Sequence, residues 1–520
     1  MELYIKPVSE IYTQSTEVKR MVVIMSVLAF ALLFVAAMNY ILNSVSSLPI
    51  RARSVGVHKC NGASSKDIFN MFLFETAALF VVALVCMALL LFAFREYVAD
   101  MAAVPTLGTL LNAQTIWLPA IMILAIFILS ALLPARLFSV IPVTQVFRVS
   151  TSGKQGWKRS LLFIQFGGIA FVITLLVIVL LQYDRLMNND LGYDPENIVY
   201  APLNNMDDQK TAKLTAELKK LPYVMATGLS SMDILSGYGG FPILDNEKNW
   251  LFTARQVNYN ADYLSLMKIP LLEGQPLKGD GDILVNESFV SKRGWTDGAI
   301  GKYIYDDEGN LKGKIVGVTR DFMVNSFFTP QLPVIMFGSD RMSYCNFTVR
   351  VSELTPEYLR EMNDRIAELF PDEDVGFTVL KTIIESQYEG TRHFRDGVFV
   401  ASIAILLITL MGLLGYITDE MHRRSKEIAI RKVNGATAPN ILRLLSKDVL
   451  ITAFPAILLG VIASRVVGES WLRQFADKIS LTVFIFISTA LLVLAIIWGC
   501  VILKSWNIAN ENPVRSIKNE

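Results

Sequence analysis

The sequence is poor in the residues from which catalytic and metal sites are usually built. Its 520 residues include only three histidines and four cysteines. The histidines, His58, His393 and His422, all lie near predicted membrane boundaries, and none has a partnered nucleophile. Neither they nor the cysteines have the spacing of a zinc site. We therefore expect neither a catalytic nor a metal site, and hence no enzymatic activity, in this chain.

A nucleotide-binding loop is also missing. The phosphate-cradling pattern Gly-x4-Gly-Lys-Ser/Thr does not occur, and the stretch from Gly298 to Lys302 is too short and has no following Ser or Thr. The chain is thus expected to bind no cofactor, and any energy that it uses must come from elsewhere. The net charge of +1 favours no particular partner, and we expect no nucleic acid to bind.

Charged residues are scarce as well, at 18%, whereas hydrophobic residues make up 53% and the mean hydropathy is +0.44. The apolar residues gather in blocks of about 20, the length that crosses a hydrocarbon core of about 30 Å. Seven spans are predicted: Met21–Leu42, Phe72–Phe94, Trp117–Leu133, Leu161–Leu181, Val398–Tyr416, Val449–Val467 and Leu481–Ile502. Gln165 is the main polar residue near the interior of a span, so the charged relay of an ion-coupled transporter is not expected.

Between the fourth and fifth spans the sequence is that of a globular domain with alternating strands and polar helices. A strand is predicted at 197–201, an amphipathic helix at 211–221 and a second strand at 225–229. Another helix is predicted at 356–370, where apolar residues recur at helical spacing. The fold class predicted is therefore an α-helical polytopic membrane protein of about seven spans with an inserted mixed α/β extracytoplasmic domain.

The basic residues predict the orientation of the spans, because Lys and Arg concentrate in cytoplasmic connections. Four alternate connections hold four, five, seven and three of them: 45–69, 136–160, 418–447 and 504–520. The connection 96–116 on the other side has none, and 468–480 has two. We expect the N-terminus and residues 183–393 to lie outside, and the C-terminus to be cytoplasmic.

The sequence repeats itself at an offset of 373 residues, so that Arg53 to Ser64 aligns with Lys426 to Thr437. Both stretches contain Lys-x-Asn-Gly-Ala, which begins at Lys59 and at Lys432, and each lies within a three-span unit. The predicted domains are an extracytoplasmic tail (1–20), a first three-span unit (21–140), a cytoplasmic linker with the fourth span (141–182), the inserted domain (183–393), a second three-span unit (394–505) and a cytoplasmic tail (506–520).

Each copy of this element is predicted to form a short interfacial helix, a tight turn and then a spanning helix. The Asn-Gly pair supplies the left-handed residue that ends a helix. Thr437 caps the next helix in the second copy, and Ser64 does so in the first, as part of a Ser-x-x-Asp start with Asp67. In the second copy a basic amphipathic helix is expected. Three apolar residues would face the membrane and three basic residues the water or headgroups: Ile428, Ile430 and Val433, and Lys426, Arg431 and Lys432.

A basic helix beside a membrane can be no more than a topogenic anchor. Two copies with the same turn favour a docking site for a cytoplasmic partner, because the Asn-Gly-Ala turn is more specific than positive charge requires. The predicted docking residues are Lys426, Glu427, Ile430, Arg431, Lys432, Asn434 and Gly435 in the second copy, and Arg53, Lys59, Asn61 and Gly62 in the first.

Two carboxylates, Glu75 and Asp448, occupy equivalent positions just inside the spans that follow. Carboxylates within membranes usually mark function. At this depth, however, pairing with Lys59, Lys432 or Arg443 is a sufficient explanation, so we assign both a structural role.

The stretch from Arg423 to Ala436, after a span that follows an extracytoplasmic domain, resembles the signature of MacB/FtsX/LolC-type ABC transporter permeases. In the inserted domain, 258–263, 267–274, 283–287 and 315–322 resemble the MacB-type periplasmic core domain. The two-unit arrangement is most similar to the large duplicated permeases of Bacteroidetes. Because those begin with a further span and a first periplasmic domain, the N-terminal part is expected to be missing here, through truncation or as a separate chain.

This resemblance implies the permease subunit of a bacterial inner-membrane ABC transporter. A separate cytoplasmic ABC ATPase would use ATP and dock on the two short helices, and its motion would reach the periplasmic domain for export or efflux (mechanotransmission). A second permease copy or the missing half, and a periplasmic adaptor, are further implied partners. Two alternatives remain: a non-transport mechanotransmitter that regulates an envelope enzyme, and a membrane receptor or sensor, against which the repeat argues.

The two copies also differ. The first has Ser54 where the second has Glu427, and His58 where the second has Arg431. We therefore expect the first docking helix to bind more weakly than the second.

Overall fold

Seven long apolar helices form the membrane-embedded part of the chain. In the computed structural model they belong to a first unit of residues 1–183, 390–474 and 479–520, and a second unit comprises 184–389 and 475–478. The structure describes residues 16–46, 48–101, 106, 108, 112, 116–139, 156–203, 208–235, 239–245, 247–324, 330–339, 345–371 and 375–509.

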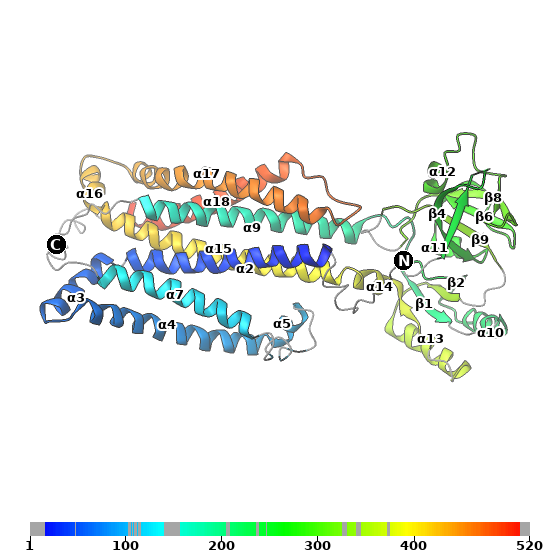
Figure 1. Cartoon of the computed structure of the whole chain (residues 1–520), viewed down its shortest axis with the longest axis horizontal. Coiled ribbons are helices and arrows are strands. Elements are labelled where there is room, and N and C mark those ends of the chain that lie inside the picture. Colours follow the sequence, from blue (N-terminus) through cyan, green and yellow to red (C-terminus); the bar gives the residue numbers. More distant parts are fainter. Residues whose placement is uncertain are drawn as a thin grey trace. The chain divides into compact units, whose positions relative to one another are not determined.

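By length and composition, each of the seven helices is able to cross a membrane, as predicted. They are α2 (Thr16–Ser46), α4 (Ser65–Ala93), α7 (Trp117–Ser139), α9 (Gly156–Asn188), α15 (Glu389–Arg423), α17 (Ala438–Leu472) and α18 (Val483–Ala509). Three short helices accompany them: α3 (Leu48–Cys60), α5 (Arg95–Met101) and α16 (Ser425–Val433). The first repeat supplies α2, α4 and α7, which pack together, and in the second α17 packs against α18 (Figure 1).

The span between the repeats, α9, is the most deeply packed of the seven: 56% of its apolar window is buried within the unit. Its backbone meets that of α17 where Gly460 approaches Gly167. Further along, Thr174 lies 3.3 Å from Thr489 of α18, hydroxyl to hydroxyl, and the Gln182 side-chain oxygen accepts a hydrogen bond from the backbone N–H of Ile479. In lipid, helices associate through such close packing and hydrogen bonds, so α9 helps to hold the bundle together.

The second unit is built on an 11-stranded mixed sheet with the order β11-β1-β10-β2-β4-β9-β6-β8-β5, to which β3 adds beside β4 and β7 beside β8. Its strands are β1 (Ile198–Leu203), β2 (Val224–Ser230), β3 (Gly239–Leu244), β4 (Trp250–Tyr259), β5 (Leu271–Gly274), β6 (Asp282–Asn286), β7 (Tyr303–Tyr305), β8 (Leu311–Thr319), β9 (Val334–Gly338), β10 (Cys345–Val351) and β11 (Thr378–Val379). Its helices are α10 (Asp208–Leu218), α11 (Tyr263–Met267), α12 (Glu287–Arg293), α13 (Pro356–Leu369) and α14 (Leu380–Ser386). The fold class predicted, seven spans with an inserted α/β domain, is thus confirmed.

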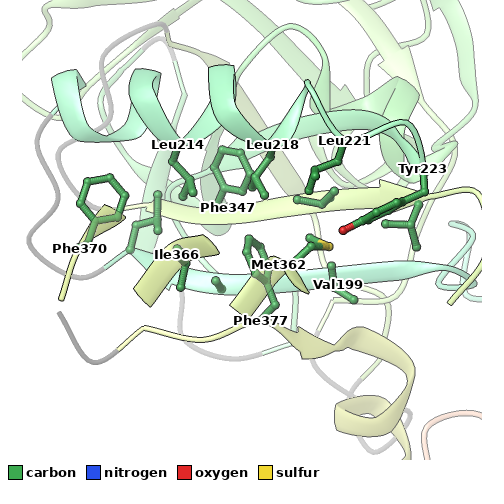
Figure 2. Packing of buried hydrophobic residues seen from close by; sticks show 14 residues of the cluster. Val199, Leu214, Leu218, Leu221, Tyr223, Phe347, Met362, Ile366, Phe370 and Phe377 are labelled. Atoms are coloured by element: carbon green, nitrogen blue, oxygen red, sulfur yellow. The ribbon is translucent and has the colours of Figure 1, made fainter. Parts of the chain in front are cut away.

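Two hydrophobic clusters lie against this sheet. In one, Leu214 and Leu218 of α10 point toward Phe347 of β10, and Met362 and Ile366 of α13 complete the packing (Figure 2). The apolar spacing that predicted α13 is therefore the spacing of its buried face. The other cluster gathers around β6, β8 and β9.

Gly460 and Gly499 provide a matched test of the packing around α9. A Cβ at Gly460 would lie 2.2 Å from the carbonyl oxygen of Gly167, whereas a Cβ at Gly499 in α18 meets no atom within 4 Å. We expect Gly460→Ala to cost about 1–3 kcal/mol by overpacking, and Gly499→Ala to gain up to about 1 kcal/mol from helix propensity. Thermal unfolding of the detergent-purified chain should show shifts of opposite sign, and equal shifts would contradict the close approach.

Candidate functional site: two short helices at one end of the bundle

The two copies of the Asn-Gly-Ala element lie at the same end of the helix bundle, where α3 leads into α4 and α16 leads into α17 (Figure 1). Each short helix ends in a turn that contains a glycine in the left-handed region, Gly62 with φ +95° and Gly435 with φ +88°. A side chain is strained in this conformation, so the glycine allows the chain to reverse within two residues.

The same hydrogen bond closes both turns. The Ala63 N–H donates to the carbonyl oxygen of His58 at 3.0 Å, and the Ala436 N–H donates to that of Arg431 at 2.9 Å. This bond between residues five apart is the Schellman end of a helix. The predicted helix ends are therefore confirmed, and the two turns are equivalent in structure as well as in sequence.

The helices that follow begin differently in the two copies. Ser64 and Asp67 form a complete capping box at the start of α4, with the Asp67 carboxylate 2.8 Å from the Ser64 backbone nitrogen. Thr437 occupies the N-cap of α17, but its hydroxyl makes no cap hydrogen bond, and the first turn contains a proline. Both predicted N-cap positions are confirmed, although only the first has the side-chain bond.

One apolar residue anchors each short helix to the bundle. Val55 of α3 is fully buried and packs with Ile68 of α4 and Ala135 of α7. At the equivalent positions of the second copy, Ile428 and Ile441 are buried as well. The repeat therefore conserves the anchor between its two copies, and with it the seating of each helix on the bundle.

The other side of each short helix exposes an apolar residue. Val57 and Ile430 are equivalent in the repeat and expose 53% and 61% of their surface. The expectation that Ile428, Ile430 and Val433 share one face is wrong, because Ile428 is buried whereas Ile430 and Val433 are exposed. Residues two apart point to different sides of a helix, so Ile428 and Ile430 separate into an anchor and a surface residue.

Charge distinguishes the two surfaces. In α16 the Arg431 guanidinium lies 2.7 Å from the Glu427 carboxylate, and both side chains are about half exposed. The first copy has Ser54 and His58 at these positions, so α3 carries no equivalent ion pair.

The remaining predicted docking residues have different environments. Lys59 donates to the Ser139 carbonyl oxygen at 2.9 Å, which ties α3 to the end of α7. Asn61 and Asn434 are exposed in the turns. Three of the basic residues lie in the short helices with side chains outside the described part of the chain: Arg53, Lys426 and Lys432.

Asp448 of α17 belongs to an ion-pair network that sequence reasoning missed. Its carboxylate lies 2.6 Å from Arg424 and 3.5 Å from Arg159 of α9, and Arg424 also bonds the buried Glu420 at 2.5 Å. Arg443 makes no ion pair with Asp448 in the described part of the chain, and the pairing with Lys432 stays a prediction because that side chain lies outside it. The i,i+4 spacing of Glu420 and Arg424 was the available signal. The network joins α9, α15 and α17 beside α16.

The other carboxylate, Glu75, is exposed on α4. Across the described residues, no three His, Cys, Asp or Glu side chains are grouped to hold a metal ion. The two short helices instead present exposed apolar residues next to polar turns on firmly seated supports, an arrangement suited to protein docking.

Three solved structures resemble the second unit at low sequence identity. The periplasmic region of MacB from Actinobacillus actinomycetemcomitans is 14% identical, with 39% of this chain and 97% of that chain covered and a TM-score of 0.29. A domain of a protein assigned as a permease from Porphyromonas gingivalis is 14% identical, with 37% and 98% covered and a TM-score of 0.28. The extracellular domain of the ABC-type transporter YknZ from Gram-positive bacteria is 12% identical, with 35% and 99% covered and a TM-score of 0.26.

None of the curated proteins matches the chain. The model of the FtsX-like permease C-terminal family matches it twice, at residues 26–143 and 399–513. Each match contains one short helix with its Asn-Gly-Ala turn and the spans around it. The chain therefore carries two copies of the C-terminal unit of FtsX-like permeases, which is typical of a permease-type membrane protein.

Proposed function

We propose that this permease docks a separate cytoplasmic ABC ATPase on α3 and α16 and passes the motion of that ATPase to its extracytoplasmic unit, for export or efflux of a substrate. FtsX-like permeases work with a cytoplasmic ABC ATPase. The observation that carries the proposal is the duplicated docking surface. Each copy has the same left-handed turn, the same buried anchor and the same exposed apolar residue, Val57 or Ile430.

Two helices offer a route for that motion. The chain passes from the first unit to the second near the end of α9 and returns at the start of α15. One residue, Arg424, separates α15 from α16, and its ion pairs join α15 to α17. A displacement of α16 is therefore transmitted to α15 with little slack, since a helix is stiff along its axis and the pair of the partly buried Arg424 with the buried Glu420 is costly to break.

The two docking surfaces are proposed to be unequal. The Glu427–Arg431 pair adds two opposite charges to α16, while Ser54 and His58 stand at the same positions of α3 and form no such pair. Charged pairs at an interface add orientation and specificity to apolar contacts. We infer that α16 provides the stronger attachment and α3 the weaker one.

The proposed orientation places α3 and α16 in the cytoplasm. The connections that contain them are rich in Lys and Arg, as cytoplasmic connections are, and both helices lie at one end of the bundle (Figure 1). The N-terminal tail and the second unit then lie on the periplasmic side, with the C-terminus in the cytoplasm of a bacterial inner membrane.

Ile430→Asp tests the docking surface directly. The side chain is 61% exposed, so a charge there should change the stability of the permease by no more than about 0.5 kcal/mol. It should nevertheless reduce co-purification of the ATPase with the tagged full chain by at least about tenfold, as expected for loss of an interface hot spot. Val57→Asp is the matched change in α3, for which we expect a smaller loss. Full retention of the ATPase by both variants would refute docking on these helices.

Glu427→Ala separates coupling from stability. The Glu427–Arg431 pair is half exposed and of the i,i+4 type, so its loss should cost only about 0.3–0.5 kcal/mol. Membrane levels should therefore be normal, while stimulation of ATP hydrolysis by the permease falls. Ser54→Ala in α3 is the control and should leave stimulation unchanged. If Glu427→Ala stimulates ATP hydrolysis normally, the Glu427–Arg431 pair is not part of the docking interface.

Cysteine labelling tests the orientation. In a cysteine-free full chain, Met225→Cys places a thiol at a position of the second unit that is 68% exposed, and restoring Cys60 places one at the exposed end of α3. A membrane-impermeant maleimide should label the first in intact cells with a permeabilised outer membrane, and the second only after lysis. The reverse pattern would invert the topology.

A further inference from the structure

Three polar residues from three different helices meet inside the membrane bundle. Gln165 of α9 and Thr409 of α15 are fully buried, and Asn39 of α2 is 7% exposed. They gather around Gly412, one turn after Thr409 on the same side of α15. A Cβ at Gly412 would lie 2.7 Å from the Asn39 side-chain oxygen and 3.3 Å from the Gln165 side-chain oxygen. Glycine is thus what allows the two amide groups to approach α15.

The Asn39 amide is oriented by a hydrogen bond. Its Nδ2 donates to the carbonyl oxygen of Ile408 at 2.7 Å, which ties α2 to α15 and directs Oδ1 toward Gly412. The first repeat supplies α2 and the second supplies α15, so this bond joins the two repeats. We treat α2 and α15 as one side of the contact and α9 as the other.

Gln165 lies at this contact without a hydrogen bond. Among the described residues neither its Oε1 nor its Nε2 has a partner, and the Thr409 hydroxyl, equally buried, has none either. A buried amide without partners is unfavourable, more so in lipid, where water does not compensate. An acceptor nevertheless lies close by in Asn39 Oδ1, and a hydroxyl in Thr409.

We propose that Gln165 is the moving part of a polar latch, in which a shift of α9 against the α2–α15 pair forms hydrogen bonds from Gln165 to Asn39 and Thr409 that the arrangement described here lacks. Gln165 Nε2 donates to Asn39 Oδ1, and the Thr409 hydroxyl donates to Gln165 Oε1. The bonded arrangement is the second state of the bundle, reached when the docked ATPase moves α15 through α16, so the latch rests on the proposed function.

The latch makes Gln165 a positioning residue with opposite effects on the two states. In the arrangement described here the buried amide of Gln165 lowers the stability of the bundle, and an apolar side chain of similar size removes that cost. In the second state the amide provides the bonds that hold α9 to both repeats. A residue with only a static structural role would stabilise the described arrangement, and its loss would lower stability.

The first experiment measures stability and needs no ATPase. Gln165→Leu in the full chain, purified in lipid nanodiscs, should unfold at a temperature equal to or about 2–4 °C above that of the native chain. Thr174→Val is the control, because this residue of α9 is equally buried but its hydroxyl bonds the Ala170 carbonyl oxygen at 2.7 Å. It should show no such gain. A midpoint for Gln165→Leu clearly below that of the native chain would overturn the latch, because Gln165 would then be making bonds in the resting arrangement.

The second experiment measures the two states. Spin labels on cysteines that replace the exposed Leu180 of α9 and Met411 of α15 report the distance between these helices by pulsed electron paramagnetic resonance. With the co-purified ATPase and a non-hydrolysable ATP analogue, the native chain should populate a second distance. Gln165→Leu should reduce that population by about fivefold or more, and Thr174→Val should not.

The outcomes separate the two proposals. A second distance that persists unchanged in Gln165→Leu would overturn the latch and leave the proposed function standing. A native chain whose distance does not respond to the nucleotide would overturn transmission through α15 itself, and the latch with it.

Discussion

The membrane part of this protein depends on the interactions that hold α9 among helices whose apolar side chains provide little driving force for association. In lipid, apolar side chains are as well solvated by acyl chains as by one another, so association relies on close backbone packing and on hydrogen bonds between helices. α9 uses both: Gly167 packs against Gly460 of α17, Thr174 lies beside Thr489 of α18, and Gln182 accepts a hydrogen bond from Ile479, just before α18. It belongs to neither copy of the repeat, yet it contacts both. The duplicated units are therefore joined through a helix that has no counterpart in either.

The two short helices, α3 and α16, share the features that seat them on the bundle and differ in their exposed side chains. The shared features are the left-handed glycine, the hydrogen bond that closes the turn and the buried anchor, Val55 or Ile428. A substitution at any of these positions would disturb the fold of the turn or the packing of the helix. Exposed positions carry no such constraint on folding, and there Ser54 and His58 stand in place of Glu427 and Arg431. The asymmetry between the two copies thus lies in exposed side chains and leaves the fold unaffected.

Local patterns predicted the spans, the turns and the α13 helix, because each depends on a few neighbouring residues: a run of apolar side chains, an Asn-Gly pair, a helical spacing. The partners of Asp448 were not predictable in the same way. Arg424 and Arg159 reach it from α15's end and from α9, and only the packing of three helices brings them together. Lys59 likewise turned out to bond the end of α7. The order of the 11-stranded sheet is also beyond local patterns, since β4 pairs with β9 across some 75 residues of intervening chain.

Buried polar residues along α9 differ in whether they have hydrogen-bond partners, and this difference affects how α9 is able to move. Thr174 and Gln182 have partners, so moving α9 past α18 breaks bonds and is opposed. Gln165 has none among the described residues, so moving α9 past α2 and α15 breaks nothing there and can form bonds. α9 is therefore restrained at its contact with α18, whereas it can gain hydrogen bonds at its contact with α2 and α15. A bundle built in this way favours rotation or sliding of α9 at the Gln165 side over separation at the Thr174 side.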